Sequence, residues 1–267
     1  MQKVVASFVI VVCLLALTGC MNSDRQQPAP EAAQQLLKLR GYEFDEKSFF
    51  AAAQARDMMA LNAFFDAGIN PNAQDSDGRT VLIAAAARGD LQVVNALLSR
   101  GVDPNVKDKR GYTAMSHAIE AMYEEVVDAL LNRPELDPNS RGLNGRPALM
   151  AYVWRDNKDR VEKLLAHGAD VTAQDADGDT ALHGAGQTGN VEIVRMLLDK
   201  GANPNAKNKV GGTPLMWAAV YGNAEAARLL LNRGADPSLK DVDGVTAAEW
   251  AERNKRDKVM QLLRGKR

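Results

Sequence analysis

Apolar and small residues recur at helical spacing along most of this chain, in short stretches joined by tight turns. Residues 80–88 read TVLIAAAAR, the dipeptide Gly89-Asp90 follows, and residues 91–100 read LQVVNALLSR. Apolar residues in each stretch lie three or four positions apart, which is the period of an amphipathic helix. A polar segment rich in Asp, Asn, Gly and Pro comes next. The pattern predicts a unit of two short helices joined by a tight turn and followed by a polar loop.

This unit repeats at an almost constant interval. The glycine that precedes each first helix recurs every 33 or 34 residues, and two positions later comes threonine or, in one unit, proline. These register glycines are Gly78, Gly111, Gly145, Gly178, Gly211 and Gly244. A second glycine after the second helix, such as Gly101 or Gly201, keeps the same step and suits a helix C-terminus with positive φ. In the third unit, residues 133–136 (RPEL) replace this glycine and add one residue, which accounts for the single interval of 34. A period of this length predicts a solenoid in which each unit covers the apolar face of its neighbour.

Two motifs within the units identify the repeat type. Residues 180–183 read TALH, and residues 213–215 read TPL. With the period of 33, these motifs closely resemble the ankyrin repeat over roughly residues 45–267. The resemblance implies an all-α repeat solenoid of stacked helix-turn-helix units joined by short hairpin loops. We expect a cap repeat at 45–77, repeats at 78–110, 111–144, 145–177, 178–210 and 211–243, and a C-terminal cap repeat at 244–267.

The fourth unit departs from the pattern. Pro147 replaces the threonine, Tyr152-Val153 replaces the small pair found at Ala85-Ala86, and Asp156-Asn157 replaces the glycine turn. Bulky residues where alanines normally sit are expected to open the stack locally or change its curvature. The alternative is drift that the core accommodates by compensating volume changes.

The first nineteen residues form a secretion signal. A short polar start is followed by an apolar run at residues 4–17, which is shorter than the roughly 20 residues of a spanning helix. The run ends in Leu17-Thr18-Gly19-Cys20, which resembles the lipobox of bacterial lipoproteins. That resemblance implies cleavage before Cys20 and acylation of Cys20, and several acyl chains anchor a protein stably. The alternative is an ordinary signal peptide or membrane anchor that happens to end in cysteine.

Residues 20–44 are interpreted as the lipidated cysteine and a flexible tether. Residues 21–35 are polar and contain two prolines, whereas residues 36–45 hold apolar residues that could form a short helix or turn against the first repeat. The residue after the cysteine is Met21 rather than aspartate, which by the same resemblance implies the outer membrane, facing the periplasm, in a Gram-negative source.

Composition excludes several classes of function. The net charge is −1 and no basic stripe is present, which argues against nucleic acid as a partner. Of the two cysteines, Cys13 lies in the apolar run of the signal and Cys20 is the residue expected to be acylated, so the repeats hold no thiol for a disulfide or a metal. Phosphate-binding loops, nucleophile elbows and zinc spacings are absent from the sequence. We therefore predict no enzymatic activity, no cofactor, no bound metal and no small-molecule substrate.

The polar residues that resemble parts of catalytic or metal sites have structural explanations. The resemblance assigns His183, in the TALH motif, to hydrogen bonds within and between neighbouring turns. Aspartate pairs at spacing two lack the rest of a calcium loop and are predicted to form hairpin turns. The pairs are Asp75 and Asp77, Asp175 and Asp177, and Asp241 and Asp243.

A binding role follows from the architecture. Ankyrin stacks expose hairpin tips and the ends of first helices along one concave side, and aromatic and arginine residues dominate interface energetics. We predict that a partner protein binds there around Tyr112, Arg146, Trp154, Arg155 and Tyr221. The alternative for Trp154 is that it fills space in the irregular fourth unit, and Trp217 and Trp250 are assigned to the core.

Three functions fit such a protein. The first is an envelope immunity protein that neutralises a toxin acting in the periplasm. The second is an assembly or protection factor for an envelope enzyme, for example an antioxidant enzyme. The third, an envelope hydrolase, has the least support.

Overall fold

The computed structural model describes residues 30–142 and 145–264, and within them the chain forms helices joined by turns and hairpin loops. The predicted signal peptide, Cys20 and the start of the tether lie outside the described residues. The helices are α2 (Pro30–Leu39), α3 (Glu46–Gln54), α4 (Met58–Asp66), α5 (Val81–Ala87), α6 (Leu91–Ser99), α7 (Ala114–Glu120), α8 (Glu124–Leu131), α9 (Ala148–Trp154), α10 (Lys158–Ala166), α11 (Ala181–Thr188), α12 (Val191–Asp199), α13 (Pro214–Tyr221), α14 (Ala224–Asn232), α15 (Ala247–Arg253) and α16 (Asp257–Arg264).

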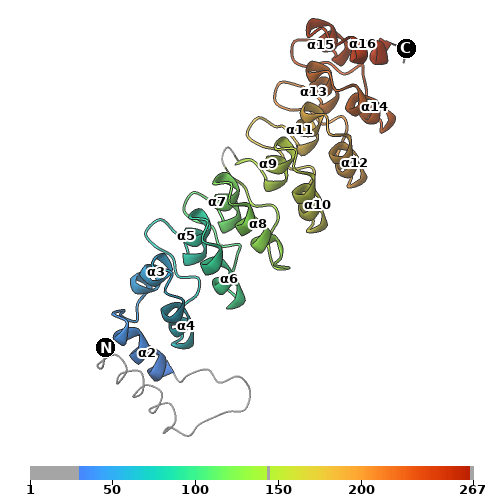
Figure 1. Ribbon diagram of the computed structural model, residues 1–267. Helices are drawn as coiled ribbons and strands as arrows, with labels where there is room; N and C mark the ends of the chain where they lie inside the picture. The colour runs from blue at the N-terminus through green and yellow to red at the C-terminus, as the bar shows by residue number, and fades with distance from the viewer. Residues whose placement is uncertain (1–29, 143–144, 265–267) are drawn as a thin grey trace.

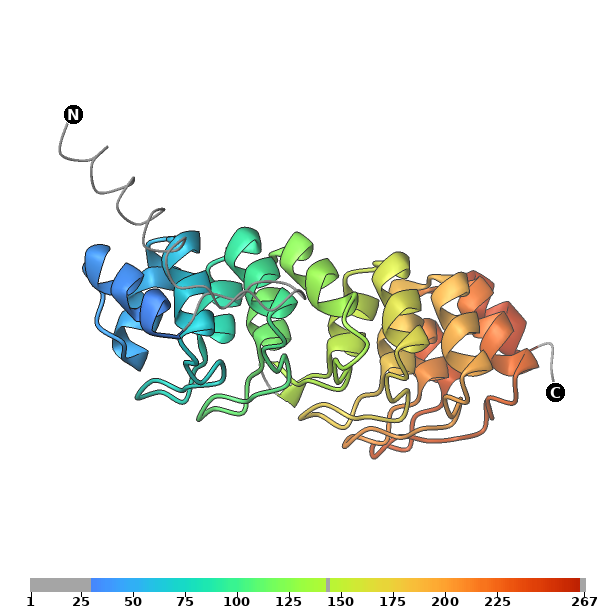
Figure 2. The ribbon, with the colours of Figure 1, turned by 90° about the horizontal axis from the view of Figure 1, so that it is seen from below.

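Seven helix pairs stack side by side in two rows (Figure 1). The odd-numbered helices from α3 to α15 form an inner row, the even-numbered helices from α4 to α16 form an outer row, and the hairpin loops project from the inner row (Figure 2). This is the all-α repeat solenoid that the sequence predicts. Among the helices that the structure describes, none has the length and apolar character needed to cross a membrane.

The helix ends follow from local sequence. The Thr80 side chain accepts a hydrogen bond from the amide of Ile83, as predicted for an N-cap, and Asp90 caps the second helix of the same unit. Gly101 follows that helix with φ of 73°, a conformation that favours glycine. The N-caps fix where each helix begins and the glycines fix where it ends, so the helices span two or three turns and the repeat units have nearly the same length.

The hairpin loops repeat a single hydrogen-bond scheme. The Oδ1 atom of Asp75 accepts from the amides of Asp77 and Arg79, and Asp175 and Asp241 bond in the same way two and four residues on. The predicted role of the aspartate pairs as turn residues is confirmed for the first member of each pair. Adjacent hairpins are joined by backbone bonds such as the amide of Lys109 to the carbonyl of Asp77, at 3.0 Å.

His183 ties one unit to the next, as predicted. Its Nδ1 accepts from the Thr180 amide at 3.0 Å, and its Nε2 lies 3.1 Å from the carbonyl oxygen of Gly212 in the following hairpin. Burial lowers the pKa of His183, which favours the neutral ring with a hydrogen on Nε2. The histidine is therefore part of the scaffold.

The N-terminal end differs from the predicted tether. Helix α2 begins at Pro30, and its buried Ala33 and Leu37 pack onto the first helix pair through α4. The prediction of a flexible tether is therefore wrong for residues 30–35, whereas the short helix or turn expected against the first repeat within residues 36–45 is present as the end of α2. The polar, proline-containing composition indicated a flexible segment, but proline at the first helical position and Glu31 in the first turn both favour a helix.

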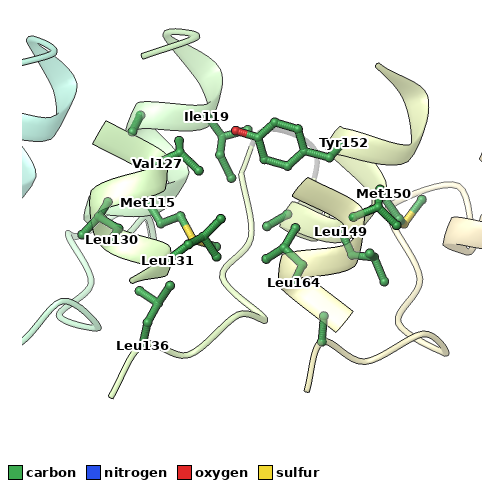
Figure 3. Packing of buried hydrophobic residues seen from close by; sticks show 14 of the residues in the cluster. Met115, Ile119, Val127, Leu130, Leu131, Leu136, Leu149, Met150, Tyr152 and Leu164 are labelled. Carbon is green, nitrogen blue, oxygen red and sulfur yellow. The ribbon is translucent and has the colours of Figure 1, made fainter. Parts of the chain in front are cut away.

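Tyr152 separates the third and fourth units. Its ring is fully buried between α7 and α9, beside Ile119, at the position where the other repeats have alanine (Figure 3). The Tyr152 hydroxyl donates to the Glu124 carboxylate at 2.9 Å, and Arg160 lies 2.8 Å from the same carboxylate. Burial, followed by the bond to Glu124, raises the pKa of Tyr152 well above its ordinary value. In Figure 2 the third and fourth units stand further apart than the units that follow.

Replacing Tyr152 with alanine, the residue of the other repeats, is expected to destabilise the protein. The separated helices would enclose a cavity, and large-to-small core changes of this kind cost about 3 kcal/mol in the free energy of unfolding. Urea unfolding followed by circular dichroism measures the change. The control Tyr152→Phe keeps the ring and loses one hydrogen bond, for a cost of about 1 kcal/mol. An unchanged or higher urea midpoint for Tyr152→Ala would contradict this account of the stack.

Candidate protein-binding face

The inner helices and the hairpins together form one long surface, here called the inner face. Its centre is the position six residues after each register glycine, which is partly exposed in five of the six units. Going along the chain, this position holds Ala84, His117, Ala151, Gly184, Trp217 and Trp250. Only Gly184 is buried there. The resemblance to ankyrin repeats predicts this surface as the one that binds.

Two of the predicted binding residues lie together on the inner face. The Arg146 guanidinium carbon is 4.1 Å from the centre of the Trp154 ring, a cation–π contact, and Arg146 Nε lies 3.9 Å from the Asp175 carboxylate. Trp154 is partly buried and packs against the core. Both Trp154 Nε1 and Arg146 Nε are buried without a hydrogen-bond partner.

Gly184 explains the position of the Trp154 ring. A Cβ atom added at Gly184 would lie 2.1 Å from ring atoms of Trp154, so the ring occupies the space that a side chain would otherwise fill. The large residue of the fourth unit is thus matched by a missing side chain in the fifth. This geometry favours the alternative in which Trp154 fills space, and a role in binding stays a prediction.

Arg155 connects the third and fourth units. Its guanidinium donates to the carbonyl of Ile119 at 2.9 Å and lies 4.0 Å from the Glu124 carboxylate. It also lies over the Tyr152 ring, with 5.6 Å to the centroid. Arg155 therefore takes part in the contacts around Tyr152, and the structure does not place it with Arg146 and Trp154.

Tyr112 belongs to a cluster of the third unit. Arg110 lies 4.9 Å from the centre of the Tyr112 ring, and the His117 ring meets it edge-on at 5.6 Å. His117 Nε2 is 2.9 Å from the Asp108 carboxylate. Burial of Asp108 opposes ionisation, but hydrogen bonds from His117 and from two backbone amides outweigh it and lower the pKa of Asp108. The cluster is a self-satisfied polar network at the base of a hairpin.

Tyr221 pairs with a tryptophan that was expected in the core. The Trp217 and Tyr221 rings are stacked, with centroids 6.0 Å apart and 4° between their planes. Tyr221 is exposed and Trp217 is only partly buried, outside the hydrophobic core. The core assignment of Trp217 is therefore wrong, whereas Trp250 packs against the core and donates from Nε1 to Asp241 at 2.8 Å.

The five predicted residues thus fall into separate groups, and of these five only Arg146 and Trp154 lie together. Sequence reasoning missed Trp217, although its phase in the repeat equals that of the partly exposed His117 and could have placed it at the surface. Within the residues that the structure describes, no group of three or more His, Cys, Asp or Glu side chains could hold a metal ion.

The pairing of Trp154 with Gly184 predicts a change of sign in a double-mutant cycle. In the wild-type chain, Gly184→Ala should lower stability by about 1–3 kcal/mol because the new Cβ displaces the indole ring. In a Trp154→Ala chain the same substitution should raise stability by about 0.5–1 kcal/mol, since alanine is the better helix former. Urea unfolding of the four chains measures both values. Equal effects of Gly184→Ala in the two backgrounds would show that the ring does not depend on the glycine.

Comparisons with known proteins agree with this architecture. The family model described as ankyrin repeats (3 copies) matches residues 49–142, 134–208 and 206–267. The crystal structure of the ankyrin repeat domain of Bcl-3, described as a unique member of the IkappaB protein family, superposes with a TM-score of 0.65 at 30% identity, covering 81% of this chain and 97% of that one. An ankyrin repeat domain from Acinetobacter baumannii gives a TM-score of 0.62 at 30% identity, covering 69% of this chain and 96% of that one.

No curated protein matches the sequence. The family model, however, covers most of the chain, and its three matches span the helix pairs from α3 to α16. Ankyrin repeats are protein–protein interaction scaffolds. The chain belongs to the ankyrin repeat family.

Proposed function

We propose that this protein is a lipid-anchored envelope protein that binds another protein through its inner face without catalysing a reaction. The observation that carries the proposal is the set of aromatic and arginine side chains that four units present on this face. Such residues contribute most of the binding energy in protein interfaces. The stacked pair of Trp217 and Tyr221 lies outside the hydrophobic core. Its exposed ring surface is therefore available to a partner.

The anchoring part of the proposal rests on the sequence at residues 17–20, which resembles a lipobox. An acylated Cys20 precedes α2 by only nine residues, so the stack would lie within about 35 Å of the membrane surface even when the connecting segment is extended. The residue after the cysteine, Met21, supports sorting to the outer membrane in a Gram-negative cell. The partner would then be a periplasmic or envelope protein.

The chemistry of the inner face supports binding over catalysis. Its titratable groups are engaged with one another, as the contact between His117 and Asp108 and the turn bonds of Asp175 illustrate. On the outer row, a shallow depression between α8 and α10 is lined by residues that include Asp128, Arg160 and Lys163, and these three form ion pairs. An envelope hydrolase therefore remains the weakest of the candidate functions.

We favour an immunity protein that blocks a toxin acting in the periplasm, with an assembly or protection factor for an envelope enzyme as the second candidate. Both candidate functions require binding to a protein. An immunity protein abolishes the activity of its partner, whereas an assembly or protection factor leaves that activity intact. The long row of partly exposed positions on the inner face suits the contact of a whole folded partner, which needs roughly 20–30 residues on each side.

Lipidation is tested by replacing Cys20 with alanine. The substitution removes the acylated thiol, so the chain should move from the membrane fraction to the soluble fraction, or remain as an uncleaved precursor, and incorporation of labelled palmitate should stop. Fractionation, gel mobility and labelling in the native host measure these changes. The control is Cys13→Ala, inside the apolar run, which should leave all three unchanged. Mature Cys20→Ala chain that stays in the membrane fraction would refute the lipid anchor.

The functional test uses the product of the gene beside this one. The purified full-length chain is titrated against that product, and both the dissociation constant and the activity of the product are measured. Tight binding with loss of activity supports the immunity function, and tight binding with activity retained supports the assembly function. Absence of binding to the products of the flanking genes, and to envelope extracts in which they are overproduced, would count against a protein-binding role.

A further inference from the structure

Positive charge is concentrated in the last repeat unit. Residues 244–267 hold seven basic and three acidic residues, a net charge of +4, whereas the rest of the chain has a net charge of −5. Around the turn that joins α15 to α16, at the end of α15 away from its hairpin, stand four exposed basic residues: Arg253, Lys255, Arg256 and Lys258. We call these four residues the C-terminal basic cluster.

The cluster reverses the charge pattern of the repeat. Arg256 stands where the three preceding units have asparagine, and Lys255 stands where the two preceding units have glycine. The position of Lys258 holds an acidic residue in each of the four preceding units, namely Glu225, Glu192, Asp159 and Glu125. The change is therefore toward positive charge at three neighbouring positions of one turn.

These substitutions do not help the last helix to form. Asn157 and Asn190 cap their helices by accepting backbone amides, whereas an arginine side chain has no acceptor atom. Lys255 has a φ of 56°, a conformation that favours glycine. Positive charge is also unfavourable near a helix N-terminus, and Asp257 is the acidic residue that offsets it in the first turn of α16.

The cluster has no acidic partner within ion-pair distance in the part of the chain that the structure describes. The nearby Arg264 differs, because it pairs with Glu252 at 3.3 Å. Elsewhere an arginine of one unit pairs with an acid of the unit before it, as Arg233 does with Asp199 at 2.6 Å. The four cations of the cluster therefore remain available to an anion from outside.

The two arginines of the cluster are held in place. Arg256 Nε donates to the carbonyl of Val220 at 3.0 Å, and the Arg253 guanidinium lies 5.4 Å from the centre of the Trp250 ring. The terminal nitrogens of Arg256 have no hydrogen-bond partner among the described residues. A guanidinium fixed in this way can donate two parallel hydrogen bonds to a carboxylate.

The need for a polar end does not explain the cluster. The last unit requires a polar outer face because no further unit covers it, but charges of either sign meet this need. The other end of the stack has exposed residues of both signs, including Lys38, Arg40, Glu43 and Glu46. A single sign of charge indicates a requirement beyond solubility.

We propose that the C-terminal basic cluster binds an acidic segment of the partner protein, with Arg256 bonded to a carboxylate. The proposal rests on the proposed function and adds a contact outside the inner face that defines the charge of the partner. Exposed ion pairs contribute little affinity each, whereas opposite charges steer two proteins together and speed their association. The cluster should therefore act mainly on the association rate, in a salt-dependent way.

Two other anionic surfaces fit the cluster less well. A membrane would meet the end of the stack that holds α2 and the proposed anchor, whereas α16 lies at the opposite end (Figure 1). The apolar residues of α16 pack against the core, so the cluster offers a membrane no apolar side chain to insert. Nucleic acid needs a longer basic surface than one turn, and the rest of this chain is negatively charged.

The test variant gives the turn the residues of the preceding unit. The substitutions Lys255→Gly, Arg256→Asn and Lys258→Glu are combined in one triple variant. Its urea midpoint should equal or exceed that of the wild type, because a glycine and an N-cap residue return to their usual positions. A lower midpoint would show that the cations serve the fold and would overturn the proposal.

The matched control is Lys38→Glu/Lys47→Glu, which makes the same change in net charge at the opposite end, where both lysines are exposed. The probe is a fluorescein-labelled peptide of alternating glutamate and serine, and its neutral counterpart alternates glutamine and serine. Fluorescence polarisation measures the binding of both peptides to the full mature chain in neutral detergent micelles.

We expect the acidic peptide to bind the wild type at low salt and the neutral peptide not to bind. The triple variant should weaken binding about fivefold or more, as expected for the loss of several exposed charge pairs, and the control should bind like the wild type. The difference between wild type and triple variant should shrink at roughly 0.15 M salt, where charges are screened beyond about 8 Å.

Three results would overturn the assignment. The first is equal binding of the acidic peptide by the wild type and the triple variant. The second is an equal loss in the control, which would show that only the total charge matters. The third is stronger competition by phosphatidylglycerol micelles or by a DNA duplex than by unlabelled acidic peptide at the same concentration of negative charge.

The proposed function is judged separately with the flanking-gene product. Its association rate at low salt should fall severalfold with the triple variant, while its dissociation rate changes little. Equal association rates for the wild type and the triple variant would refute the cluster and leave the function standing. A product that binds neither chain would count against the function itself.

Discussion

Each helix pair of this protein depends on the pair beside it to cover its apolar side. A unit of two short helices buries only the residues between them, and helices of seven to ten residues are marginal on their own in water. Leu97 and Leu130 are fully buried because adjacent units press their outer helices together, and Ala85 and Ala218 are fully buried where the inner helices approach most closely. Stability is therefore a property of the interfaces, and a change within one unit acts mainly through its neighbours.

The hairpins keep these interfaces in register. An Asp or Asn side chain closes each of five hairpins by accepting two backbone amides. Backbone bonds then link several adjacent hairpin tips, as between Lys209 and Asp177. His183 adds a side-chain link from an inner helix to the following hairpin. Since these polar groups satisfy one another, the proposed binding by the inner face would depend mainly on its aromatic, apolar and arginine side chains.

Periodicity allowed the sequence to predict the fold, because the same physical requirement recurs in every unit. The register glycines, the threonine caps and the aspartate turns each have a local cause that can be read from a few residues, and the structure confirms the caps at Thr80 and the turns at Asp75. The start of helix α2 was not predicted because this helix has no counterpart in the other units, and the polar residues around Ala33 and Leu37 hid their helical spacing. The position of Trp154 could not be read from its own unit, since the space it fills is created by Gly184 in the next one.

The irregular fourth unit and the tip residue Val210 break the repeat pattern in physically different ways. Tyr152 replaces alanine, and its burial and its hydrogen bond to Glu124 stabilise the larger side chain. The Trp154 ring fills the space beside Gly184, so packing accounts for both residues. Val210, by contrast, stands just before its register glycine, where the other units have aspartate, arginine or asparagine, and its side chain stays exposed. A departure that the fold compensates indicates packing, whereas one that it leaves uncompensated on an exposed surface indicates an interaction outside the chain. By this criterion Trp154 is a packing residue, and exposed Val210 is the better candidate for contact with the proposed partner.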